Sequence, residues 1–107
     1  MNRALQQHKA DFFKSMASPM RLAMLEMLAE RESSVTQLAE AVGLAISTAS
    51  RHLSQLRAAG VIDATHRGAT LVYGLADERV AELLKTARAI IAKRLQTTTE
   101  LLADLGA

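Results

Sequence analysis

The chain has 107 residues, of which 50% are hydrophobic and 22% are charged, so its size and composition fit one small folded domain and not a disordered segment. Aromatic residues make up only 3% of the sequence, which argues against surfaces that stack on single-stranded nucleic acid or on carbohydrate. The formal net charge is +2, and the absence of cysteine excludes disulfides, thiolate metal sites, thiol redox sensing and cysteine nucleophiles.

The first third of the chain predicts two helices. Residues 2–16 show a helical apolar pattern, whose candidate buried positions are Leu5, Phe12, Phe13 and Met16. Ser18 and Pro19 mark the start of a second helix, because a hydroxyl can cap the first turn and proline fits the first helical position. This helix extends to about Ala29, and its apolar stripe consists of Leu22, Leu25, Met27 and Leu28.

A helix-turn-helix is predicted for about residues 34–59. Ser34-Val35-Thr36-Gln37 has the form of a capping box, which begins a short helix that Gly43 ends as a left-handed C-terminal cap. The second helix begins near Ile46 and runs to about Ala59, where Gly60 ends it. Its inward-facing residues are Leu53 and Leu56.

A β-hairpin follows the helix-turn-helix. Two short extended runs, Val61–His66 and Leu71–Leu75, are separated by a turn-sized segment that contains Gly68, which is typical of a hairpin. The second run alternates with the period of a half-buried strand. We expect this hairpin to form a wing over about residues 61–75.

Asp77 is expected to cap a long final helix over about residues 78–103. The apolar positions of this helix are Val80, Leu83, Leu84, Ala87, Ile90, Ile91, Leu95, Leu101 and Leu102. So wide an apolar face needs a partner, and few other elements of so small a domain are free to cover it. We therefore expect a two-fold dimer that forms through the helices at about 2–16 and 78–103.

The excess positive charge lies in the middle of the chain. Acidic and basic side chains balance in residues 1–45 and again in residues 76–107, whereas the segment between them carries Arg51, Arg57 and Arg67 against a single aspartate. A local basic patch is the electrostatic footprint of a polyanionic partner. Together with a helix-turn-helix, it favours double-stranded DNA as that partner.

The second helix of the helix-turn-helix is the one expected to enter the major groove. Small hydroxyls allow a helix to approach the sugar–phosphate backbone closely, and arginine and glutamine can reach bases or phosphates. His52 neighbours this set and could contact a phosphate or contribute to packing. The outward side of the helix carries Ser47, Thr48, Ser50, Arg51 and Gln55.

Five stretches of the chain form a recognisable pattern. They are residues 11–16 (DFFKSM), 18–22 (SPMRL), 37–44 (QLAEAVGL), 47–57 (STASRHLSQLR) and 59–62 (AGVI). With these stretches the sequence resembles the ArsR/SmtB family of bacterial winged-helix repressors over roughly Ala10 to Leu84. The resemblance implies a mainly α fold with a small β-hairpin, and a homodimeric repressor that leaves an inverted-repeat DNA site when an inducer, often a metal ion, binds.

The resemblance also implies which residues contact DNA. The recognition helix carries most of them, and Arg67 falls at the wing tip, which in the family tends to reach the minor groove or its phosphates. The complete set that we expect to bind DNA is Thr36, Ser47, Thr48, Ser50, Arg51, His52, Gln55 and Arg67.

The chain departs from the family where many members bind metal. Members often carry a cysteine pair near the start of the short third helix, where this chain has residues 33–36 (SSVT), and hydroxyls are poor ligands for soft ions. A second family site uses aspartate and histidine of the final helices, but no histidine follows His66 here. Asp77, Glu78 and Glu82 remain, and carboxylates alone suit hard ions weakly. We predict no metal site and no cofactor, and we leave open an effector of unknown small-molecule or ionic class.

Two alternatives remain beside a DNA-binding repressor. One is a family member without the usual thiol sensor, which is regulated by a non-thiol ligand or a hard metal ion, or which senses no ligand and is regulated by its abundance or by a partner protein. The other is a protein-interaction module that uses the fold without DNA. An enzyme is not expected, because the sequence has no phosphate-binding glycine loop, no metal-ligand spacing and no Ser-His-acid set on predicted loops. The polar segment Met1–Ala10 and the lack of a membrane-length apolar run predict a cytoplasmic protein.

Overall fold

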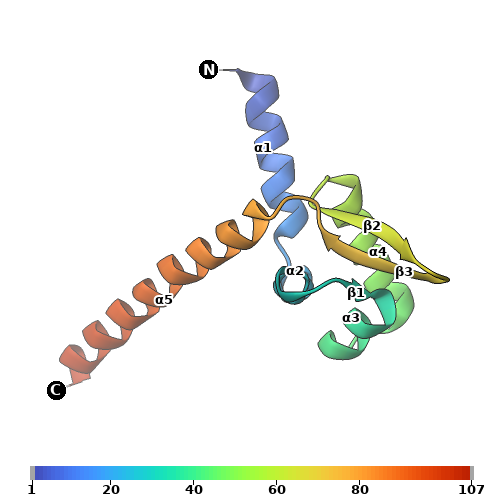
Figure 1. The fold of residues 1–107 in the computed structure, drawn as a ribbon. Helices are drawn as coiled ribbons and strands as arrows, with labels where there is room; N and C mark the ends of the chain where they lie inside the picture. The colour runs from blue at the N-terminus through green and yellow to red at the C-terminus, as the bar shows by residue number, and fades with distance from the viewer. Residues whose placement is uncertain (1, 107) are drawn as a thin grey trace.

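The computed structural model describes residues 2–106, so the ends of the predicted domain 1–107, Met1 and Ala107, lie outside the described residues (Figure 1). Within that range the helices are α1 (Arg3–Met16), α2 (Pro19–Glu30), α3 (Val35–Val42), α4 (Ile46–Ala58) and α5 (Arg79–Gly106). The strands are β1 (Ser33–Ser34), β2 (Ile62–Arg67) and β3 (Thr70–Leu75). The observed helices therefore follow the predicted ones closely, except that α5 continues beyond residue 103.

Capping residues set where the helices begin and end. Ser18 caps α2, because its hydroxyl accepts a hydrogen bond from the Arg21 N–H at 3.4 Å. The predicted capping box at α3 is complete: Ser34 Oγ accepts from the Gln37 N–H at 3.2 Å, and Gln37 Oε1 accepts from the Ser34 N–H at 2.9 Å. Gly43 then ends α3 with a φ of 71°, in the left-handed region that favours glycine.

The wing is a three-stranded antiparallel sheet in the order β1-β3-β2, so it has one strand more than the predicted hairpin. The last pair of the β2–β3 ladder joins Arg67 to Thr70, which leaves a shorter turn than the sequence suggested. The additional strand β1 pairs with β3 through Ser33 and Ser34. Two residues are too few to show a strand period, and this is why pattern analysis missed β1.

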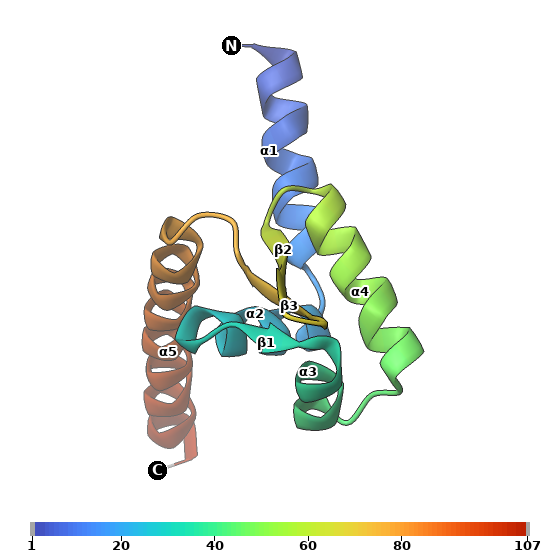
Figure 2. The same cartoon turned by 45° about the vertical axis from the view of Figure 1, so that its right-hand side comes forward.

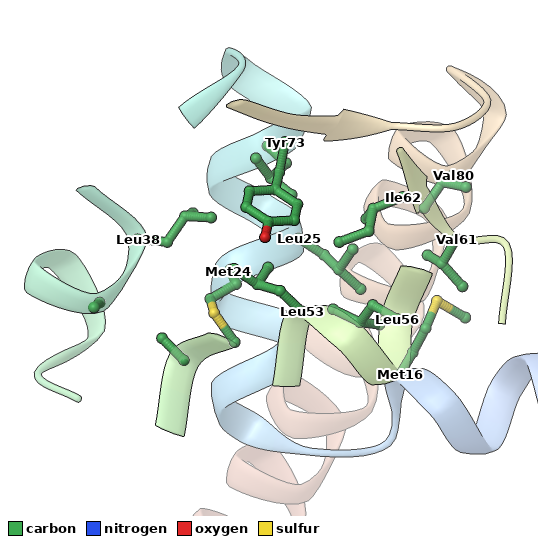
Figure 3. Packing of buried hydrophobic residues seen from close by; sticks show 13 residues of the cluster. Met16, Met24, Leu25, Leu38, Leu53, Leu56, Val61, Ile62, Tyr73 and Val80 are labelled. Carbon is green, nitrogen blue, oxygen red and sulfur yellow. The ribbon is translucent and has the colours of Figure 1, made fainter. Parts of the chain in front are cut away.

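The hydrophobic core lies between α2, α3, α4 and the sheet (Figure 3). Leu25 of α2, Leu38 of α3, Leu53 of α4 and Ile62 of β2 are fully buried, and Tyr73 of β3 packs against the same cluster. A helix-turn-helix cannot bury its own apolar faces, so α2 and the sheet provide the surfaces against which it packs. The sheet therefore helps to fix α4.

Three residues predicted to be buried are exposed in the single chain. Leu5 and Phe13 of α1 are 52% and 54% exposed, and Leu22 of α2 is 38% exposed, whereas Met24 takes a fully buried position in α2. The reason is that α1 projects away from the body and buries only Met16, near its C-terminal end (Figure 1). Periodicity identifies the apolar face of a helix but does not say which part of that face has a partner.

The helix α5 begins beside the core and then extends away from it (Figure 1). Val80 in its first turn is buried, but its later apolar residues are 55% to 84% exposed; these are Ile90, Ile91, Leu95, Leu101, Leu102 and Leu105. No helix within residues 2–106 combines the length and the apolar character needed to cross a bilayer. The apolar face of α5 from Ile90 onward therefore has no cover within residues 2–106.

Asp77 organises the start of α5. Its Oδ1 accepts a hydrogen bond from the Arg79 N–H at 2.9 Å, and its Oδ2 accepts from Nη2 of the Arg79 guanidinium at 2.6 Å. These hydrogen bonds, the one from the Arg79 side chain above all, lower the pKa of Asp77 to about 2. Asp77 therefore carries its charge at the entrance to the helix, where negative charge is favoured.

Candidate nucleic-acid interface

The helix α4 packs on the core with one side and presents its other side to solvent (Figure 2). Ala49, Leu53 and Leu56 are fully buried, and their spacing of four and three residues places them on one stripe of the helix. The predicted contact residues occupy the rest of the surface. Ser47, Arg51 and Gln55 are exposed, while Thr48 and Ser50 are half-buried.

The N-terminal end of α4 carries no side-chain cap. Ala45 occupies the capping position and offers no hydrogen-bonding side chain to the first turn. The first N–H groups of a helix carry partial positive charge, and without a side-chain cap they remain available to an anion such as a phosphate. Ser47 and Thr48 lie in this first turn, so their hydroxyls would accompany the backbone donors.

Arg51 is an exposed cation on α4. Residues 2–106 contain two salt bridges, Arg67 with Glu32 and Arg79 with Asp77, and neither involves Arg51. A guanidinium that is not engaged within the protein can pair with a phosphate or a base without first breaking a contact. Arg51 can therefore pair with an anion without losing a salt bridge, as can Arg57, the other exposed arginine of α4.

His52 is engaged within the protein by one of its ring nitrogens. Its Nδ1 accepts a hydrogen bond from Arg21 Nε at 2.9 Å, and Arg21 Nη1 donates to the Ser15 carbonyl oxygen at 3.0 Å. His52 is half-buried. Arg21 and His52 are 31 residues apart, so no local pattern in the sequence connects them or marks Arg21.

Arg67 lies at the end of β2 beside the wing turn, as predicted, and it pairs with Glu32. Its Nη2 is 3.0 Å from Glu32 Oε1, and its Nε donates to Glu32 Oε2 at 3.2 Å. This hydrogen bonding and the charge of Glu32 raise the pKa of Arg67. The two side chains are 61% and 50% exposed, so water reaches both of them and an external anion can compete with Glu32 for Arg67.

The remaining predicted residue, Thr36, is exposed in the first turn of α3. The predicted set therefore comes from three elements, α3, α4 and β2. In Figure 1 these elements lie together on the right of the molecule, and α5 extends to the lower left. Figure 2 again shows α4 and α5 on opposite sides of the body.

The structure gives no metal-binding cluster in the region it describes. Across residues 2–106, no three histidine, aspartate or glutamate side chains gather as an ion would require. Ser33 is buried and Ser34 caps α3, so the stretch that replaces the cysteine pair of the family takes part in folding. The lack of a metal site stays a prediction.

Comparison with known proteins identifies relatives along most of the chain. A family model described as bacterial regulatory protein, arsR family, matches residues 18–64. The HTH-type transcriptional regulator Rv0081 of Mycobacterium tuberculosis is 43% identical over 100 residues, which cover 92% of this chain and 88% of Rv0081. The crystal structure of Rv0081 matches with a TM-score of 0.84 and 40% identity, over 92% of this chain and 99% of that chain.

Two further proteins extend the comparison. The solution structure of a homodimeric winged helix-turn-helix DNA-binding domain, Mb0332 of Mycobacterium bovis, matches with a TM-score of 0.82 and 32% identity, over 88% of this chain and 87% of that domain. The probable mercury resistance operon repressor of Streptomyces lividans is 35% identical over 83 residues, 78% of this chain and 66% of the repressor. These matches confirm the predicted winged helix-turn-helix fold.

Proposed function

The chain belongs to the arsR family of bacterial regulatory proteins, and from this premise we propose that it is a repressor that binds an inverted-repeat DNA site as a homodimer. It is a transcriptional regulator with a DNA-binding winged helix, as its relatives are. Beyond this, we propose that the chain forms a homodimer, that it represses transcription, and that the residues of the predicted set contact the DNA. In this proposal each subunit is one winged helix-turn-helix domain that spans residues 1–107.

The observation that carries the proposal is the exposed side of α4. Arg51 and small hydroxyls lie on this side, the helix begins without a side-chain cap, and the buried stripe opposite holds the helix rigidly on the core. A major groove accepts a helix of this kind, with the arginine reaching a base edge or a phosphate. The wing residue Arg67 then lies beside the same duplex, where its partner Glu32 can be exchanged for a phosphate.

A second copy of the chain is the proposed cover for the apolar faces of α1 and α5. An open groove of about 180 Å³ lies among α1, α2 and α5, and it is lined by Phe13, Met16, Ala17, Leu22, Leu83, Leu84 and Ala87. A two-fold axis on this side leaves both α4 helices facing outward, and paired recognition helices bind half-sites about 34–36 Å apart. The M. bovis domain, which is described as homodimeric, supports this arrangement.

The proposed effector does not act through a thiol, because the chain contains no cysteine. Three possibilities remain: a hard ion bound by oxygen ligands, a small organic molecule, and no ligand at all. The S. lividans relative is named for mercury resistance, but a thiolate mercury site has no counterpart in this sequence. We therefore place this chain outside the family members that sense through a thiolate site.

Replacing Arg51 with alanine tests the DNA-binding role of α4. We expect the wild-type protein to select a duplex from a random-sequence pool and to bind it with an affinity that falls steeply with salt. The Arg51→Ala variant should bind this duplex about 1–3 kcal/mol more weakly if the side chain reads a base. Fluorescence anisotropy with the labelled duplex measures the difference. Arg3→Ala, the same truncation at an exposed residue of α1, is the control, and equal binding by all three proteins would contradict the proposal.

Replacing Glu32 with glutamine tests the role of the wing. The change removes a carboxylate that competes with phosphates for Arg67, so the same duplex should bind about two- to fivefold more tightly, the range of an exposed ion pair. The midpoint of urea unfolding should barely change. Glu100→Gln on α5 removes an equal charge far from the wing and should leave affinity unaltered. Weaker binding by Glu32→Gln would show that Arg67 needs Glu32 and does not exchange it for DNA.

A further inference from the structure

Arg21 connects three helices of the protein. It lies in the first turn of α2, its Nη1 donates to the carbonyl oxygen of Ser15 in the last turn of α1, and its Nε donates to Nδ1 of His52 in α4. The donor–acceptor distances are 3.0 Å and 2.9 Å. The end of α1 and the middle of α4 are thus held by one rigid, planar group.

Neither acceptor of Arg21 is a carboxylate. Neither of the two salt bridges within residues 2–106 involves Arg21, and the side chain is half-buried. A half-buried guanidinium without a carboxylate partner depends on well-placed hydrogen bonds to offset its desolvation. The bonds to Ser15 and His52 therefore constrain the positions of both partners.

The contact with Arg21 also determines the protonation pattern of His52. A guanidinium has only N–H donors, so the Nδ1 atom that accepts from Arg21 must carry a lone pair. The ring proton of neutral imidazole is then on the other nitrogen, Nε2. The hydrogen-bond network thus assigns His52 as the tautomer that donates from Nε2.

The Nε2 atom of His52 is accessible to solvent. Nε2 forms no hydrogen bond within residues 2–106, where the one side-chain hydrogen bond of His52 is made by Nδ1. Every buried side-chain nitrogen or oxygen of the non-exposed residues in that range has a hydrogen-bond partner, so Nε2 is not buried. Because His52 as a whole is half-buried, its Nε2 must reach the surface. It does so on α4, directly after Arg51, where a phosphate oxygen could accept from it.

We propose that Arg21 is a positioning residue for DNA binding, which orients His52 so that its Nε2–H donates to a phosphate of the bound duplex. This inference rests on the proposed function, because it requires α4 to contact DNA. Arg21 itself does not touch the duplex. It acts by fixing the tautomer and the ring orientation of His52 and by holding α4 against the end of α1.

Three variants and one control test this role with the labelled duplex selected by the wild-type protein. Arg21→Lys keeps the charge but cannot donate to both acceptors with the same rigid geometry. His52→Asn keeps an acceptor near the position of Nδ1 and loses the donor at Nε2. Each single variant should bind about tenfold more weakly, as expected for one lost hydrogen bond to a charged group. The double variant should be no weaker than either single variant, because both act on one contact.

Two further readouts separate positioning from a direct contact or a folding defect. The slope of affinity against salt should be unchanged in a further variant, Arg21→Gln, which removes the charge, because losing a cation that bound a phosphate itself would lower that slope by about one unit. Long-range proton–nitrogen NMR of the wild-type protein with neutral His52 should show the proton on Nε2, and Arg21→Lys should show a mixture of tautomers. Arg3→Lys, the same change at an exposed residue of α1, should resemble the wild type in every measurement.

The outcomes distinguish this inference from the proposed function. If the wild-type protein selects no duplex, the proposed function fails, and the role of Arg21 in DNA binding fails with it. If the wild-type protein binds and Arg21→Lys binds equally well, only the positioning role is overturned. A proton on Nδ1 of His52 in the wild-type protein also overturns it, as does a lower salt slope in Arg21→Gln.

Discussion

Replacing Ile91 with glutamate should convert the protein into a folded monomer that no longer binds its DNA site tightly. Ile91 is 55% exposed in the single chain, so a charge at this position costs the monomer fold little. In the proposed dimer the same position is covered by the partner, and a carboxylate buried there without a partner charge is strongly unfavourable. A monomer also loses the simultaneous binding of two half-sites, which corresponds to a fall in affinity of about 10²–10⁴-fold.

Light scattering coupled to gel filtration measures the mass of the Ile91→Glu variant, circular dichroism its helix content, and fluorescence anisotropy its affinity for DNA. Ala89→Glu is the matched control, because residue 89 is exposed and lies about 200° around α5 from residue 91. The control adds the same charge on the opposite side of the helix and should remain dimeric. A variant at Ile91 that still eluted as a dimer and still bound DNA would place the interface elsewhere.

Replacing Leu53 with alanine should cause a large loss of stability. Leu53 is fully buried, and with Ala49 and Leu56 it attaches α4 to the core (Figure 3). Truncating a fully buried leucine removes favourable transfer free energy and leaves a cavity, and the free energy of unfolding falls by about 2–5 kcal/mol. For a domain whose total stability is about 5–15 kcal/mol, this is a large fraction.

Urea unfolding followed by circular dichroism measures this loss, with all proteins at one concentration because dimerisation contributes to apparent stability. Ile46→Ala makes a comparable truncation at a residue of the same helix that is 53% exposed and lies outside the proposed dimer faces, and it should alter the free energy of unfolding by less than about 0.5 kcal/mol. Equal effects at the two positions would mean that Leu53 is not part of a close-packed core.

The local signals in the sequence identified, without the structure, the helix that we propose to face DNA. Gly43 and Gly60 bracket α4, and the apolar spacing of Ala49, Leu53 and Leu56 defines its buried stripe and therefore its outward side. Such signals involve residues at most a few positions apart, because a cap or a helix face is formed by neighbouring residues. For the same reason the placement of Arg51 on the exposed side could be predicted.

The sequence alone therefore determined the order and approximate ends of the helices, the winged helix-turn-helix fold, and the exclusion of thiol chemistry. The tertiary structure alone decided the pairing of Arg21 with His52 and of Arg67 with Glu32, which join residues 31 and 35 positions apart. It also decided that Phe13 and Ile91 remain more than half exposed within residues 2–106. Contacts of this kind depend on how helices and strands pack in space, and no pattern of neighbouring residues specifies them.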